Sequence, residues 1–191
     1  MPMKKAHGFA MLEVLISMLV IMFGVLGIAG IQMLSINNTE TARYQSVATI
    51  LASSMAAEIQ ANFAYWGGLL VPPATITVTG TTISGITPFP GGTCLNSVCT
   101  PTQLAYYDLQ NWGAAMSGLA NADGASNPGM TLPAATGTIA CAATTPVVCT
   151  LTLSWSENNI ALSNPTGAES GVLASGTAST HSYQTLVSIQ Q

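Results

Sequence analysis

The uncharged run from Val14 to Ile36 constrains the fold of this chain more than any other feature of the sequence. At about 1.5 Å of rise per residue, a helix of this length crosses a hydrocarbon core of about 30 Å. Lys4 and Lys5 precede the run, so the positive-inside tendency predicts a cytoplasmic N-terminus and an external remainder. Glu13 lies at the start of the run, where a carboxylate costs about 2.5–3.5 kcal/mol on insertion scales. A membrane helix is therefore expected, with a glutamate that needs an explanation.

Two ordinary interpretations leave that glutamate unexplained. A secretory signal peptide would have a short basic region, an apolar region and a cleavage site such as Gly27-Ile28-Ala29. The apolar run is too long for that apolar region, and Glu13 lies near its start. An uncleaved signal anchor accounts for the length of the run but not for Glu13.

The stretch "HGFAMLEVL" resembles the processing site of type IV prepilins, a family whose leader is removed by a dedicated membrane peptidase. The resemblance implies cleavage after Gly8 and N-methylation of Phe9, which becomes the first residue. Glu13 then takes the position at which this family keeps a glutamate. Its implied role is to pair, during assembly, with the new amine of a neighbouring subunit, because an ion pair relieves the cost that each group carries alone in the membrane.

The chain divides into four expected segments: a leader (1–8), a transmembrane and assembly helix (9–36), an amphipathic helix of the head (37–66) and a periplasmic globular head (67–191). In the third segment, apolar residues recur at helical spacing. They are Val47, Ala48, Leu51, Met55, Ile59 and Phe63. We expect one long helix from about Phe9 to Asn62, with Gly67-Gly68 as a stop. Gly24, Gly27 and Gly30 leave two alternatives open, close helix approach or local unwinding, and the resemblance slightly favours unwinding.

The head is expected to contain a second helix and a sheet. Leu69 to Thr93 reads as a loop with one or two edge strands. Thr100, Pro101 and Gln103 predict a capped helix start, followed by an apolar stripe of Ala105, Leu109, Trp112, Met116 and Leu119. "GTIACA", "PVVCTLTLSW" and "HSYQTLVSI" predict strands, with a long loop from Ser156 to Thr180. The expected class is α+β: a pilin-like fold in which the long helix packs on an antiparallel sheet with a second short helix.

The four cysteines are expected to form disulfides outside the cytoplasm. Four cysteines allow three connectivities, of which we favour the two local ones, Cys94–Cys99 and Cys141–Cys149. A zinc site is poorly supported, because neither pair is C-x-x-C and the only histidines are His7 and His181.

The head also resembles one group of the family, the PilV minor pilins. The similar residues follow the pattern C-x4-C-T-P-x-x-x-A-x-x-D-x-x-x-W from Cys94 to Trp112. The resemblance implies a low-copy subunit that helps to prime pilus assembly and lies at the pilus tip. Implied partners are other minor pilins, the major pilin, the prepilin peptidase, the inner-membrane assembly platform and often a tip adhesin. A minor pseudopilin of a type II secretion system is the alternative, since it shares the N-terminal chemistry.

Composition argues against nucleic-acid binding and against enzymatic chemistry. Charged residues make up 5% of the chain, against about 25% in ordinary domains, and only Arg43 is basic after the leader. No nucleophile-elbow or phosphate-loop motif is present. His181 is more simply a solvated or hydrogen-bonded residue, and Trp112 and Trp155 lie on apolar stripes. Asp108 and Glu157 would form a carboxylate pair only if the fold brought them together. We expect no enzymatic activity, cofactor or metal.

Overall fold

The computed structural model of the chain describes residues 10–68, 75–89, 93–124, 131–143, 145–158 and 178–189. The chain forms two compact units, residues 1–40 and residues 41–191. One helix, α1 (Ala10–Ala61), contributes to both units. Its extent confirms the expected long N-terminal helix, although the predicted start at Phe9 falls just outside the described residues.

In the first unit, α1 exposes large apolar side chains around its whole circumference. The exposed fractions range from 82% at Met11 to 54% at Val14, and Ile36 is 63% exposed. A helix that is apolar on all sides is suited to lipid or to contact with other helices. By length and composition, α1 could cross a membrane, and it is the one such helix in the described part of the chain. Gly24, Gly27 and Gly30 all lie within the helix, with nothing within 4 Å of a Cβ added at any of them.

In the second unit, residues 41–61 of α1 bury one face in the head. Most of the predicted stripe is buried, and Ala52 joins it. Phe63 is an error in the prediction, because its side chain is 37% exposed. Asn62 leaves helical geometry (φ −97°, ψ 51°) and a short helix, α2 (Phe63–Trp66), follows. The change of direction turns Phe63 outward, and Trp66 is buried instead.

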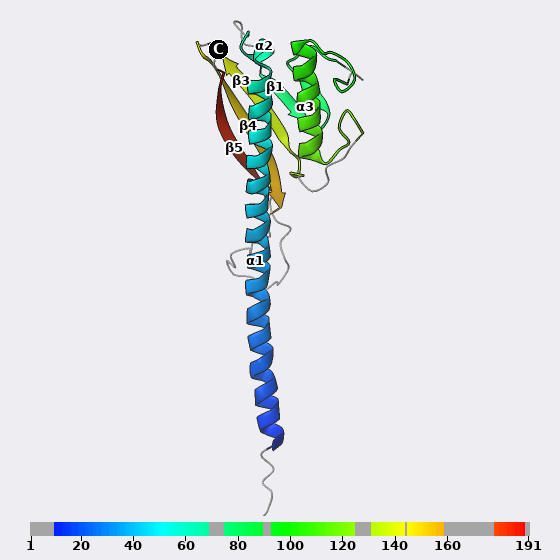
Figure 1. The fold of residues 1–191 in the computed structure, drawn as a ribbon. Helices are drawn as coiled ribbons and strands as arrows, with labels where there is room; N and C mark the ends of the chain where they lie inside the picture. Colours follow the sequence, from blue (N-terminus) through cyan, green and yellow to red (C-terminus); the bar gives the residue numbers. More distant parts are fainter. Residues whose placement is uncertain are drawn as a thin grey trace, which may run out of the picture. The chain divides into compact units, whose positions relative to one another are not determined.

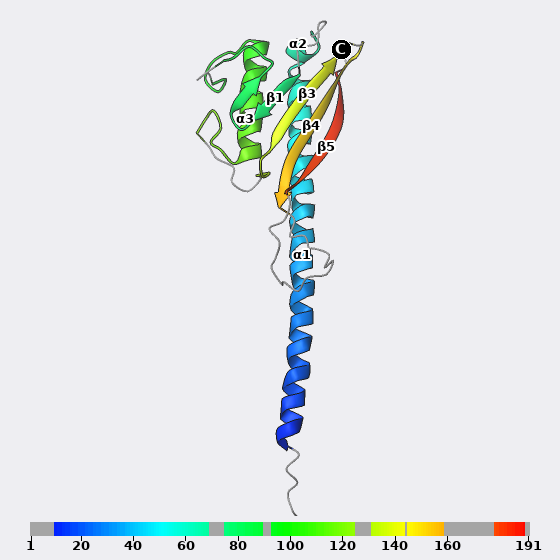
Figure 2. The same cartoon turned by 180° about the vertical axis from the view of Figure 1, so that it is seen from behind.

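The described part of the head contains one five-stranded antiparallel sheet in the order β2-β1-β3-β4-β5. Its strands are β1 (Ile76–Thr79), β2 (Thr82–Ser84), β3 (Thr136–Ala142), β4 (Val147–Asn158) and β5 (Ala178–Ile189). Residues 41–61 of α1 and the helix α3 (Pro101–Ser117) lie on the same face of this sheet (Figures 1 and 2). The α+β class and the antiparallel sheet are therefore confirmed.

Two sheet expectations are met only in part. The stretch from Leu69 to Thr93 was expected to give one or two edge strands: β2 is an edge strand, whereas β1 lies inside the sheet between β2 and β3. Ile76 and Val78 are fully buried, and their alternation fixes which face of β1 meets the core. A loop was expected from Ser156 to Thr180, but both ends of this stretch are strand, because β4 continues to Asn158 and β5 starts at Ala178. Residues 159–177 lie outside the described residues.

Helix α3 begins as its sequence predicts. The Thr100 hydroxyl accepts from the Gln103 amide at 3.3 Å, and the Gln103 side chain accepts from the Thr100 amide at 2.9 Å. This reciprocal pair satisfies two backbone donors that a helix start leaves unpaired. Gly118 ends the helix in the left-handed region (φ 68°). Leu119 therefore lies beyond the helix and is 47% exposed, so its predicted place on the apolar stripe is wrong.

Both disulfides join cysteines that are close in sequence. Cys94 bonds to Cys99 just before α3, and Cys141 bonds to Cys149 across the β3–β4 hairpin. In that hairpin Cys141 and Cys149 are register partners, and the inward side chains of β4 from Val147 to Trp155 are buried. The alternation in "PVVCTLTLSW" thus indicated both the strand and the face that it buries.

Trp112 joins three elements of the head. Its indole Nε1 donates to the Leu51 carbonyl of α1 at 2.9 Å. Its ring lies against Gly137 of β3, where an added Cβ would overlap ring atoms of Trp112. The absence of a side chain at Gly137 therefore lets α3 approach the sheet closely.

We predict that Gly137→Ala destabilises the head by about 1–3 kcal/mol, the usual range for overpacking a core. Chemical unfolding of the full chain in detergent, followed by tryptophan fluorescence, measures the effect. Gly24→Ala is the control, because a Cβ there meets nothing within 4 Å. An unchanged midpoint for Gly137→Ala would contradict the packing described for Trp112.

Candidate functional site

Of the residues expected to act in processing and assembly, the structure describes only Glu13. Gly8 and Phe9 lie outside the described residues. Glu13 lies in the first turn of α1, and its side chain is exposed among exposed apolar neighbours. A helix N-terminus stabilises a nearby carboxylate by about 0.3–1 kcal/mol. Insertion scales put a charge at the centre of a membrane helix at about 2.5–3.5 kcal/mol, so an end effect of this size offsets at most part of such a cost.

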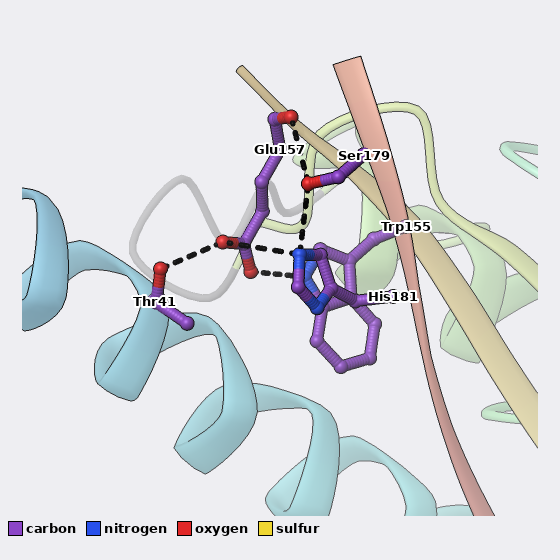
Figure 3. A network of polar contacts seen from close by, with 5 residues as sticks. All are labelled: Thr41, Trp155, Glu157, Ser179 and His181. Carbon is purple, nitrogen blue, oxygen red and sulfur yellow. Dashed lines mark hydrogen bonds and ion pairs between the residues drawn. The ribbon is translucent and has the colours of Figure 1, made fainter. Parts of the chain in front are cut away.

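A second polar cluster lies where β4 and β5 meet α1 in the head (Figure 3). Glu157, only 4% exposed, accepts hydrogen bonds from the Thr41 hydroxyl at 2.8 Å and from the Trp155 indole at 2.7 Å. Nε2 of His181 lies 3.7 Å from Oε2 of Glu157. The imidazole ring of His181 stacks on the ring of Trp155, with a distance of 6.0 Å between the ring centroids. The buried carboxylate thus accepts hydrogen bonds from α1 and β4 and lies close to an imidazole of β5.

Ser179, His181 and Glu157 have the residue types of a hydrolytic triad but not its geometry. The Ser179 hydroxyl lies 3.0 Å from Nε2 of His181, the same nitrogen that Glu157 approaches. A triad needs the nucleophile and the acid on opposite ring nitrogens, so that the base can take a proton while the acid orients it. The cluster therefore has a structural explanation: it ties Thr41 of α1 to the last two strands.

A pair of carboxyl groups lies between α1 and α3. The two helices run antiparallel. At the start of α3, the Pro101 carbonyl accepts a hydrogen bond from Asn62 Nδ2, just after α1, at 2.7 Å. Further along α3, Trp112 donates to the carbonyl of Leu51, which precedes Asn62 by eleven residues. Glu58 and Asp108 lie between these two anchors. Burial and the charge of Asp108 raise the pKa of Glu58 to about 7, and burial raises the pKa of Asp108 to about 6.

One carboxylate oxygen of Glu58 lowers the stability of the folded head. Oε1 accepts a hydrogen bond from the Ser54 hydroxyl at 3.4 Å. Oε2 is buried and has no hydrogen-bond partner among the described residues. A buried acceptor without a donor costs about 1–3 kcal/mol, and more when it is charged. Protonation of Glu58 lowers that cost, which agrees with burial as the first cause of its raised pKa.

The structure does not bring Asp108 and Glu157 together. Asp108 lies near Glu58, whereas Glu157 contacts Thr41, and these two positions of α1 are about 25 Å apart at about 1.5 Å of rise per residue. The carboxylate pair that the sequence suggested is therefore not formed, and the actual partner of Asp108 was missed. The signal for it was weak: Glu58 lies next to the buried face of α1, one residue before Ile59.

One cavity in the described part of the head has a volume of about 770 Å³. Its lining includes Tyr44, Thr79, Ser117, Leu119 and Pro133 and contains no charged or histidine side chain. Within the described ranges no three His, Cys, Asp or Glu residues are grouped so that they could hold a metal ion. The cavity therefore provides hydroxyl and apolar contacts but no carboxylate, imidazole, ammonium or guanidinium group.

No protein-family model, no curated protein and no solved structure matches this chain.

We predict that the head becomes less stable as the pH rises from about 4.5 to about 7. The folded pKa of Glu58 is about 7, above its ordinary value of 4.5, so the folded state binds the proton more tightly. The stabilisation is complete below about pH 4.5 and is lost as the pH passes the folded pKa. After allowance for partial exposure, the loss is on the order of 2 kcal/mol.

Glu58→Gln should make this pH profile shallower, because the amide stays neutral at every pH and only the contribution of Asp108, whose pKa is also raised, remains. Denaturant midpoints of the full chain in detergent between pH 4.5 and 7.5 measure it. Glu40→Gln, at an exposed position of the same helix, should keep the original slope. Equal slopes for all three proteins would show that Glu58 is not the group responsible.

Proposed function

We propose that this chain is a minor pilin of a type IV pilus, cut after Gly8 and N-methylated at Phe9. In this role it helps to start filament assembly and ends at the pilus tip with other minor pilins. Its head lies in the periplasm while α1 is still in the inner membrane. The proposal makes the chain a structural subunit without enzymatic activity.

The observation that supports the proposal best is the composition of α1 along its length. The same helix carries an exposed apolar half, with Glu13 in its first turn, and a head half with one buried face. A plain membrane anchor needs neither the glutamate nor a helix that continues into the core of the head. A subunit that leaves the lipid and packs its apolar half against neighbouring helices uses both features.

Glu13 supplies the assembly step in this proposal. Cleavage creates a new amine at Phe9, four residues before Glu13 in the sequence. In the bilayer each charged group alone is costly, whereas a pair formed between two subunits relieves part of that cost. The free energy released on pairing favours the assembled state, and the apolar side chains around α1 supply the remaining contact surface.

The experiment is Glu13→Val in the cells that encode the protein. We expect normal cleavage at Gly8 and normal amounts in the inner membrane, because the substitution makes α1 more apolar. Incorporation into sheared filaments should fall about tenfold or more, since a loss of about 1.4 kcal/mol already gives a factor of ten. Quantitative mass spectrometry of filament and membrane fractions measures both.

Glu40→Val is the matched control, because Glu40 is an exposed glutamate of the same helix beyond the apolar run. It should enter filaments at the native level. Native-level incorporation of Glu13→Val would contradict the assembly role of the glutamate. Recovery of the native chain only in a secretion apparatus would favour a pseudopilin instead.

A further inference from the structure

The two edge strands of the head sheet differ in length and in their protection against pairing with a further strand. At one edge, β2 has only three residues and is flanked by Gly80 and Gly85, both in the left-handed region. Short edge strands are a common protection against unwanted strand pairing. At the other edge, β5 has twelve residues, about 40 Å of extended backbone, against about 5–6 residues in an average strand.

β5 lacks the usual features that prevent pairing at an edge. It contains no Lys, Arg, Asp, Glu, Pro or Gly. Each residue from Ala178 to Ile189 has a register partner in β4, so no bulge interrupts it. Among the described strands, none pairs with its outer side. Its outward N–H and C=O groups form a continuous row, and Leu186 beside them is 69% exposed.

We propose that the outer edge of β5 binds an extended, uncharged segment of a different subunit, which adds a sixth strand to the head sheet. Alternating backbone donors and acceptors match another extended backbone, and the absence of charge along β5 suits a segment that is itself uncharged. The apolar Leu186 gives this segment a side-chain contact on the open face of the sheet. This inference rests on the proposed function, because it takes the chain to be one subunit of an assembly.

A second copy of this chain fits the edge less well. Residues 41–61 of α1 run along one face of the sheet (Figures 1 and 2). An antiparallel β5–β5 pair has a twofold axis perpendicular to the sheet, which points the N-terminal ends of the two head helices in opposite directions. Both ends continue into an apolar run, and two chains held in one membrane must present those runs from the same side. The partner is therefore a different polypeptide.

Photo-cross-linking in the cells that encode the protein tests the proposal. A benzoylphenylalanine is placed at Ser182, Gln184 or Leu186 of the full chain, all of which are exposed. The control position is Thr81, exposed at the opposite edge of the same sheet. We expect cross-links from all three β5 positions and a yield at least about tenfold lower from Thr81. Each step of two residues along β5 should move the cross-linked residue of the partner by two positions in a constant direction.

Two proline variants add a test that does not depend on side-chain contacts. In an edge strand, neighbouring residues direct their N–H groups alternately to the paired strand and outward. Of Gln184→Pro and Thr185→Pro, one therefore removes a bond to β4 and lowers the stability of the head. The other keeps the head folded, as proline is tolerated at an outward position. The folded variant should lose the cross-link from Ser182 about tenfold.

Three results would overturn the inference: scattered cross-links without the two-residue step, cross-links between two isotopically distinguishable copies of this chain, or an unchanged cross-link in the folded proline variant. The N-terminus of the cross-linked chain separates this inference from the proposed function. A chain that starts at Phe9 but lacks the stepwise cross-links contradicts only the strand addition. Stepwise cross-links on a chain that still starts at Met1 contradict only the minor-pilin proposal.

Discussion

The burial of one face of α1 is the interaction on which the head depends. Val47, Leu51, Met55 and Ile59 pack into the core that the sheet and α3 complete. The last described segments of the chain return to the same helix, because Glu157 of β4 accepts a hydrogen bond from Thr41. α3 does the same through the bond from Trp112 to the Leu51 carbonyl. Removing this face would uncover part of the sheet, and it would leave Trp112 without its acceptor and Glu157 without its Thr41 donor.

The same helix imposes opposite demands on its two halves. The head half of α1 has one buried apolar face and one exposed polar face. Its apolar face is shielded from water by the rest of the head. The half from Met11 to Ile36 exposes apolar side chains on every side and is stable only in lipid or among other helices. In our proposal, this half is surrounded first by the bilayer and then by neighbouring subunits. The low charge of the whole sequence fits such a surface.

Local patterns predicted most of the elements, because their causes are local. The capping box of Thr100 and Gln103 fixed the start of α3, and strict alternation from Val147 to Trp155 identified the buried face of β4. The predictions for Phe63 and Leu119 failed because the backbone changes direction just before each of them. Phe63 follows the break in the helix at Asn62, and Leu119 follows Gly118, which has a left-handed conformation. Periodicity continues a helix past such points, since it contains no information about where the backbone turns. Contacts between distant residues, such as Glu58 with Asp108 and Glu157 with Thr41, were not predictable from spacing at all.

The central claim is that Glu13 acts together with a new amine at Phe9, and the N-terminal mass of the protein recovered from membranes tests it most directly. Intact-protein mass spectrometry with sequencing of the N-terminal peptide gives the first residue and its modification. The account predicts a chain that starts at Phe9 and carries one additional methyl group. A chain that starts at Met1, or near Gly30 after signal-peptide cleavage, would contradict it and leave Glu13 without an amine to pair with.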